Sequence, residues 1–218
     1  MDIFRLIEKV TIPESWPGFK DPNRLEELDD LATDAFNRAT SDGYLAYVLI
    51  AHQVCDELLR LLIAHTRFAV RLMIVPSGFD VKFSSKEDDS DLEKLTTGHL
   101  IDVLEHSLEF EDKDEFLKLC RELSEIRNKL AHALGRNLDV ANLKETTNKY
   151  RAKYERAEEL FFQADDTFRL LYKDSKKDDS WDLILEDMLE DGLDPGAEAE
   201  CRRVIELRKA AGYGVASD

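Results

Sequence analysis

The longest apolar stretch of the sequence, from Asp42 to Val75, has the residue spacing of an amphipathic helix. Its polar residues recur as a narrow stripe: Gln53, Asp56, Glu57, Arg60, Arg67 and Arg71. Nearly every other position is apolar, so the stretch predicts the central helix of a helical bundle. Because charged side chains interrupt it throughout, we do not expect it to span a membrane.

Apolar residues at helical spacing predict four further helices in this bundle. They cover residues 21–36, 91–108, 113–134 and 140–172. Asp21 before Pro22 is typical of a helix start, and Asp112 with Glu115 fits a capping box. Gly135 fits the end of the helix over 113–134. Gly98 weakens the helix over 91–108, so Thr96 is an alternative start for it. No segment alternates like a strand, and the predicted class is an all-α antiparallel bundle of about five helices.

The composition of the chain changes on both sides of this bundle. Residues 1–20 predict an N-terminal arm that packs over the core, and residues 21–173 form the bundle itself. Residues 174–218 predict an acidic linker and a helical tail, with short helices over 181–189 and 197–210.

The net charge of -17 disfavours a generic binder of nucleic acid or of anionic membranes, because like charges repel. No helix-turn-helix is evident, so we do not expect specific DNA binding. The stretch from Arg121 to Arg156 differs from the rest, with nine Lys and Arg residues against five acidic residues.

The cysteines and most histidines predict no catalytic or metal chemistry. Cys55, Cys120 and Cys201 lie far apart, which favours buried, reduced thiols. No zinc-ligand spacing is present, and we expect neither a metal nor a cofactor. His52, His65, His99 and His106 are interpreted as core or helix-surface residues, and Tyr150, Tyr154, Phe161 and Phe168 as core. The N-terminus has no long apolar segment typical of a signal peptide, so we expect a cytoplasmic protein.

One segment of the basic stretch combines residues suited to RNA cleavage: Arg127-Asn128-Lys129-Leu130-Ala131-His132. Cleavage requires a proton taken from a 2′-hydroxyl, a proton given to the leaving 5′-oxygen and stabilisation of phosphate charge. His132 can transfer protons near neutral pH, Arg127 can bind phosphate oxygens, and Asn128 can orient either group. Lys129 and Arg136 are the predicted RNA-binding residues beside it.

This segment resembles the Arg-Asn-x-x-x-His motif of the HEPN superfamily of helical domains, and its place late in a long bundle helix also fits. The resemblance implies a homodimer acting as a metal-independent endoribonuclease of toxin or defence type. It assigns catalysis to Arg127, Asn128 and His132. Other HEPN members have no known activity and serve as binding modules.

The helical geometry of the motif limits how it can work. At about 100° per residue, Arg127 lies roughly 40° from the apolar stripe at Leu123, and His132 lies roughly 180° from that stripe. Arg127 and His132 therefore point apart, while Asn128 and His132 share one face. Either the last turn before Gly135 distorts, or a second protomer completes the site.

Two other interpretations remain open. In the first, Arg127 pairs with Asp56 or Glu57 in a purely structural role, and His132 simply lies at a helix end. Alternatively, the protein is a non-catalytic module that binds a protein partner, which the acidic composition favours. A looser resemblance to the mannitol-operon regulator (MltR-like) proteins, carried by Ser41-Asp42-Gly43 and the segment from Ala51 to Leu59, implies a regulatory module of this kind.

Overall fold

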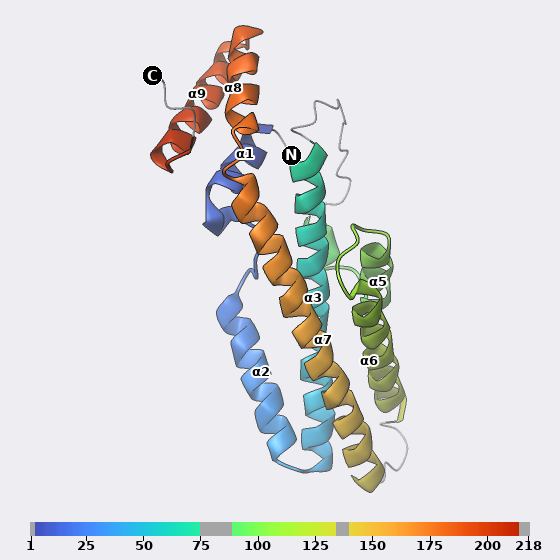
Figure 1. Ribbon diagram of the computed structural model, residues 1–218. Helices are drawn as coiled ribbons and strands as arrows, with labels where there is room; N and C mark the ends of the chain where they lie inside the picture. The colour runs from blue at the N-terminus through green and yellow to red at the C-terminus, as the bar shows by residue number, and fades with distance from the viewer. Residues whose placement is uncertain (1–2, 75–88, 134–139, 214–218) are drawn as a thin grey trace. The chain divides into compact units, whose positions relative to one another are not determined.

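The computed structural model describes residues 3–74, 89–133 and 140–213, and within these ranges all regular structure is helical (Figure 1). The predicted all-α class is confirmed. The helices are α1 (Ile3–Thr11), a 3-10 turn η1 (Pro13–Ser15), α2 (Pro22–Asn37), α3 (Ser41–Ile74), α4 (Asp89–Leu92), α5 (Thr97–Glu105), α6 (Lys113–Ala133), α7 (Val140–Ser175), α8 (Ser180–Glu190) and α9 (Pro195–Ala210).

The starts of two predicted helices can be compared with the structure. The Asp21 carboxylate accepts a hydrogen bond from the backbone N–H of Arg24 and caps α2 as predicted. The helix α6 starts at Lys113, but the capping box predicted there is wrong. Asp112 has a left-handed backbone with φ of 57°, and the Glu115 carboxylate binds Arg156 instead. The predicted cap at Gly135 lies outside the described residues.

The prediction of one helix over 91–108 is wrong. The chain turns after Leu92, and α5 begins at Thr97, the alternative start near Thr96. Gly98 lies in the first turn of α5 and does not break it, and the turn after Leu92 lets the backbone carbonyl of Leu92 accept a hydrogen bond from Arg60. At the other end, the buried ammonium of Lys113 donates to the carbonyls of Glu105 and Ser107, which fixes the end of α5 beside the start of α6.

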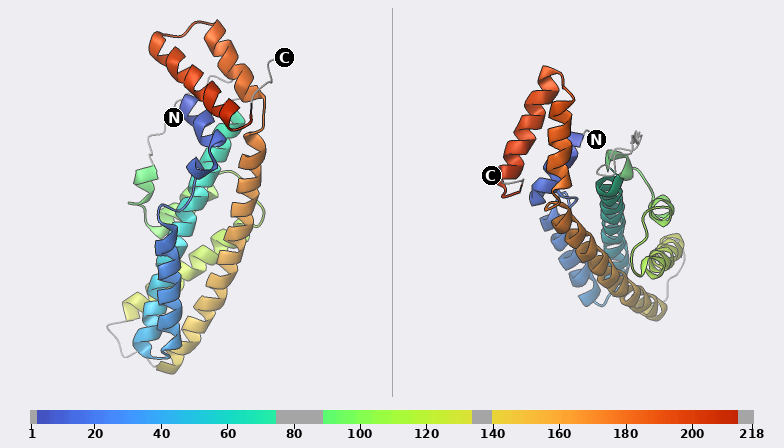
Figure 2. Two further views of the ribbon diagram at one scale, coloured as in Figure 1. Left: turned by 90° about the vertical axis from the view of Figure 1, so that its left-hand side faces the viewer. Right: turned by 45° about the horizontal axis from the view of Figure 1, so that its top comes forward.

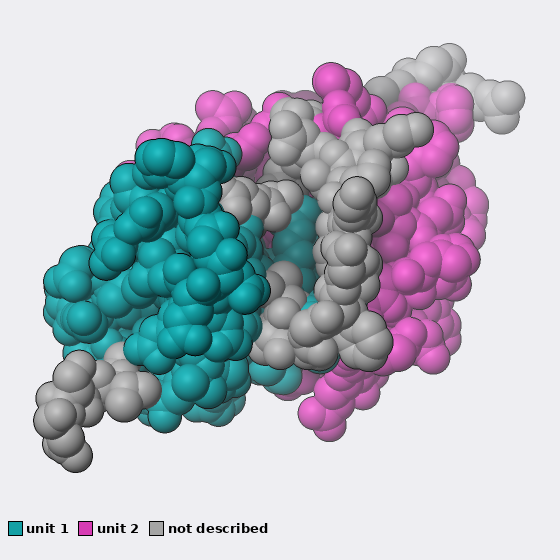
Figure 3. Space-filling view, turned by 90° about the horizontal axis from the view of Figure 1, so that it is seen from above, with its two compact units in different colours: residues 1–18, 65–86, 166–218 teal, residues 19–64, 87–165 magenta. Residues whose placement is uncertain are grey.

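The chain divides into two compact units (Figure 3). Unit 1 comprises residues 1–18, 65–86 and 166–218, and unit 2 comprises residues 19–64 and 87–165. The long helices α3 and α7 each contribute to both units. The predicted N-terminal arm and C-terminal tail thus fall largely in one unit, together with the C-terminal ends of the two long helices, residues 65–74 of α3 and 166–175 of α7.

Unit 2 contains the motif helix α6. The first part of α7 runs in the same direction as α3, and α2 and α6 run in the opposite direction (Figures 1 and 2). Ion pairs from α7 to α6 fix their antiparallel register, since Lys153 binds Glu122 and Arg156 binds Glu115. The buried side chains between these helices are mostly large and apolar: Tyr47, Leu58, Leu62, Phe116, Leu123, Tyr150, Tyr154 and Phe161.

Unit 1 contains the helix of the N-terminal arm, α1, which packs against α9. Phe4, Ile7 and Val10 bury one face of α1, and α9 buries Cys201 and Val204. The arm therefore forms a helix that shares a core with the C-terminal helices, a structure that the sequence analysis did not predict.

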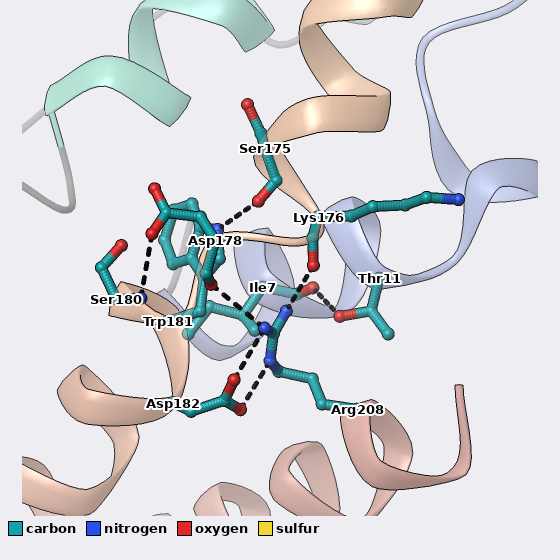
Figure 4. Close-up of polar contacts among 9 residues, drawn as sticks. All are labelled: Ile7, Thr11, Ser175, Lys176, Asp178, Ser180, Trp181, Asp182 and Arg208. Atoms are coloured by element: carbon teal, nitrogen blue, oxygen red, sulfur yellow. Dashed lines mark hydrogen bonds and ion pairs between the residues drawn. The ribbon is translucent and has the colours of Figure 1, made fainter. Parts of the chain in front are cut away.

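A buried arginine joins the C-terminal helices of unit 1 (Figure 4). The Arg208 side chain is fully buried and forms a two-pronged ion pair with the Asp182 carboxylate, at 2.7 and 2.8 Å. It also donates to the backbone carbonyls of Lys176 and Asp178, just beyond the end of α7. One guanidinium thus links α9 to α8 and to the chain between α7 and α8.

Candidate functional site

The motif residues lie in the last two turns of α6, as predicted. Leu123 and Leu130 of this helix are buried, Arg127 is half-buried, and Asn128 and His132 are exposed. Arg127 therefore lies at the edge of the core and His132 on the solvent face, as the helical geometry predicts. The helix stays α-helical to Ala133, so a distorted last turn does not bring Arg127 and His132 together within the described residues.

Arg127 is bound to its neighbour in the motif. The Arg127 Nη1 group donates a hydrogen bond of 2.8 Å to the Asn128 side-chain carbonyl. The alternative that Arg127 pairs with Asp56 or Glu57 is wrong. The Glu57 carboxylate binds Arg60 at 2.7 Å, and Asp56 accepts a hydrogen bond from the Thr97 hydroxyl at 2.8 Å. Asn128 thus binds one nitrogen of the Arg127 guanidinium at the protein surface.

Most basic residues between Arg121 and Arg156 are neutralised by acids on the same or a neighbouring helix. Six of the nine form ion pairs: Arg121–Glu105, Lys129–Glu125, Lys149–Glu145, Arg151–Glu155, Lys153–Glu122 and Arg156–Glu115. These side chains do not form the continuous positive surface that a generic RNA binder requires. The predicted RNA-binding residue Lys129 is one of them, and Arg136 lies outside the described residues.

Arg127 and Lys144 are different, because neither forms an ion pair within the described part of the chain. Lys144 is exposed and its charge is solvated. Arg127 is half-buried, and its hydrogen-bond acceptor, the Asn128 amide, carries no charge. A partly desolvated guanidinium without a carboxylate partner is a favourable place for an anion to bind.

A buried polar chain that sequence reasoning missed crosses the core of unit 2. The Thr97 hydroxyl donates to Asp56 at 2.8 Å, and Thr97 Oγ1 lies 3.2 Å from His52 Nε2. On the other side of the same ring, the Tyr150 hydroxyl lies 3.3 Å from His52 Nδ1. His52 and Asp56 lie one turn apart on α3, and this spacing can be seen in the sequence. No pattern in the sequence identifies their partners, Thr97 on α5 and Tyr150 on α7.

The three cysteines are reduced and buried, as predicted. Cys55 and Cys120 lie together where α3 meets α6, with 3.8 Å between their sulfur atoms. The hydrogen bond with Cys55 and burial raise the pKa of the Cys120 thiol well above its usual value, so it stays protonated. Among the residues that the structure describes, no group of three or more potential ligands is placed to bind a metal ion.

The remaining aromatic and histidine predictions are confirmed. Tyr150, Tyr154, Phe161 and Phe168 are buried, as are His52 and His65, whereas His99 and His106 lie on helix surfaces. None of the described helices is both long and apolar enough to cross a membrane. No protein-family model matches the sequence, and neither a curated protein nor a solved structure matches the chain.

Proposed function

We propose that the protein is a HEPN-type domain that cleaves RNA without a metal ion and acts as a homodimer. The main support is that Arg127 forms no ion pair among the described residues. Its guanidinium lies at the edge of the core and is hydrogen-bonded to Asn128, while most basic residues of the surrounding stretch are paired with acids. A guanidinium that forms no ion pair within the described residues, on a helix that also carries an exposed histidine, suits a phosphodiester substrate.

The proposed roles follow from the chemistry of each side chain. Arg127 binds the non-bridging phosphate oxygens as the 2′-hydroxyl attacks phosphorus and the 5′-oxygen leaves. His132 is exposed and takes the proton from the 2′-hydroxyl or gives one to the 5′-oxygen. The products are a 2′,3′-cyclic phosphate and a 5′-hydroxyl. The reaction requires no oxidant and no metal ion. Asn128 keeps the guanidinium oriented through its carbonyl.

The dimer is part of the proposal because one regular helix keeps Arg127 and His132 apart. They are five residues, or about 140°, apart around α6. Two copies of the solvent face of α6, brought together by a two-fold axis, would place His132 of one protomer near Arg127 of the other. This is the second of the two geometries that the motif allows, and the regular helix to Ala133 favours it.

The test is metal-free cleavage of RNA by the purified protein. A panel of mixed-sequence RNAs is incubated in EDTA, and products are checked for cyclic phosphate ends. His132→Ala is expected to lower cleavage by about 100-fold or more. His106→Ala, which removes another exposed histidine of unit 2, should leave it unchanged. The absence of cleavage by the unmodified chain over the whole panel would overturn the proposal.

A second candidate function is a non-catalytic module that binds a protein partner, in line with the looser MltR-like resemblance. The neutralised basic stretch favours it, because paired charges contribute little to the affinity for RNA. Fluorescence anisotropy with a mixed-sequence RNA separates the two functions. Binding that weakens steeply with salt supports the ribonuclease, and no binding at low salt supports the module.

A further inference from the structure

In the buried polar chain of unit 2, each group donates its hydrogen bond to the next group in the same direction. Thr97 has one hydroxyl proton, and at 2.8 Å it is donated to the Asp56 carboxylate. The contact with His52 Nε2 therefore requires this nitrogen to donate to Thr97 Oγ1. In a neutral ring, His52 Nδ1 is then the acceptor for the Tyr150 hydroxyl. The chain runs from Tyr150 through His52 and Thr97 to Asp56, with a neutral imidazole in its middle.

The register of α3 and α6 places this chain beside the motif. The two helices run in opposite directions (Figure 1). They touch at Cys55 and Cys120. His52 precedes Cys55 by three residues and Arg127 follows Cys120 by seven, which corresponds to about 4.5 Å and 10.5 Å along the axes. Side chains on a helix lean toward its N-terminus, so the long Arg127 side chain extends back toward the level of His52.

Electrostatics agree with this placement. Burial lowers the pKa of His52 below its usual value, the Asp56 carboxylate opposes that effect, and the Arg127 guanidinium lowers the pKa further. His52 is therefore neutral at pH 7, which is the state in which Nδ1 accepts from the Tyr150 hydroxyl. Both ring nitrogens are occupied by Thr97 and Tyr150, so the ring offers no acceptor to the guanidinium.

We propose that Tyr150, His52, Thr97 and Asp56 form a positioning network for Arg127. The network places a rigid, neutral ring behind the guanidinium, and Thr97 binds the Asp56 carboxylate at its far end. Arg127 is then left to face outward, where Asn128 holds it. This inference rests on the proposed function for its role in cleavage, but its structural content can be tested separately.

The first experiment uses nuclear magnetic resonance on the whole chain labelled with 15N, and the His52 signals are assigned with a His52→Gln variant. We expect the Nε2–H tautomer of a neutral ring at pH 7. Arg127→Met should raise the pH midpoint of His52, whereas Lys129→Met, on the exposed face of the same helix, should not. An Nδ1–H tautomer, or the same midpoint in both variants, would overturn the network.

The second experiment measures cleavage by Tyr150→Phe, which removes one hydroxyl from the network. His52 Nδ1 then loses its donor and becomes an acceptor that competes for the guanidinium. We expect a decrease of about tenfold or more in kcat, because small displacements of a charge-stabilising group are costly. Tyr47→Phe, which removes the hydroxyl of another buried tyrosine of unit 2, is the matched control and should keep the original rate.

The two experiments separate the two proposals. Equal cleavage by Tyr150→Phe and by the unmodified chain would overturn the positioning role. If the unmodified chain cleaves no RNA, the proposed function fails, and the tautomer and midpoint of His52 still decide whether the network holds Arg127.

Discussion

At the scale of single residues, a buried charge is tolerated where every donor or acceptor finds a partner. Arg208 is fully buried in unit 1, but its donors are taken by the Asp182 carboxylate and by two backbone carbonyls. The contrast with Arg127 is informative. Arg208 forms its hydrogen bonds inside the protein and is structural, whereas Arg127 lies half-buried at the core edge and forms no ion pair among the described residues.

We predict that Arg208→Met destabilises unit 1 by about 3–5 kcal/mol, because it leaves Asp182 buried without its counter-ion. The measurement is urea unfolding followed by the fluorescence of Trp181, a buried residue of α8. Arg202→Met is the matched control, since it removes an exposed ion pair with Glu198 from the same helix. Equal stability of the two variants would contradict the structural role of Arg208.

The sequence predicts the placement of the motif residues but not their partners. Helical spacing alone puts Arg127 at the core edge and His132 in solvent, because both positions depend only on the geometry of one helix. The Asn128 contact of Arg127 and the Thr97 and Tyr150 contacts of His52 depend on side-chain rotamers and on packing between helices. No spacing rule contains that information.

At the scale of helices, the sequence predicts an end well where it identifies the capping residue. The helix α2 starts at Pro22, where Asp21 caps it as predicted, whereas α9 starts at Pro195 after Asp194, two residues before the predicted start at 197. The α1 helix was missed, because nine residues form a marginal helix by themselves. Its stability comes from packing against α9, which is distant in the sequence and invisible to a local pattern.

Two aspartates at helix starts in unit 1 provide a test of capping. The Asp194 carboxylate accepts hydrogen bonds from the backbone N–H groups of Gly196 and Ala197, whereas Asp179, at the start of α8, makes no such bond. We predict that Asp194→Ala lowers the free energy of unfolding by about 1 kcal/mol and that Asp179→Ala changes it by much less. Thermal unfolding followed by circular dichroism measures both. A larger loss for Asp179→Ala would show that capping does not set the stability of these helices.

At the scale of the molecule, the division into two units follows from where the chain ends pack. The first 18 residues and the last 53 belong to unit 1, so its core requires segments from both ends of the sequence. Sequence periodicity identifies the helices of such a unit but not their association, since the pairing of α1 with α9 is a long-range contact.

This arrangement predicts what removal of the N-terminal arm does. Without residues 1–18, α9 loses its packing against α1, whose Phe4, Ile7 and Val10 are buried in unit 1. We expect hydrogen exchange to become faster in α8 and α9 and to stay unchanged in α5 and α6, which belong to unit 2. Glu8→Gln removes only the surface ion pair of α1 with Arg203 and should have little effect. If α9 keeps its protection from hydrogen exchange in the shortened chain, the shared core is not what stabilises it. If α6 also loses protection, the motif depends on unit 1 for its stability, and the two units unfold as one.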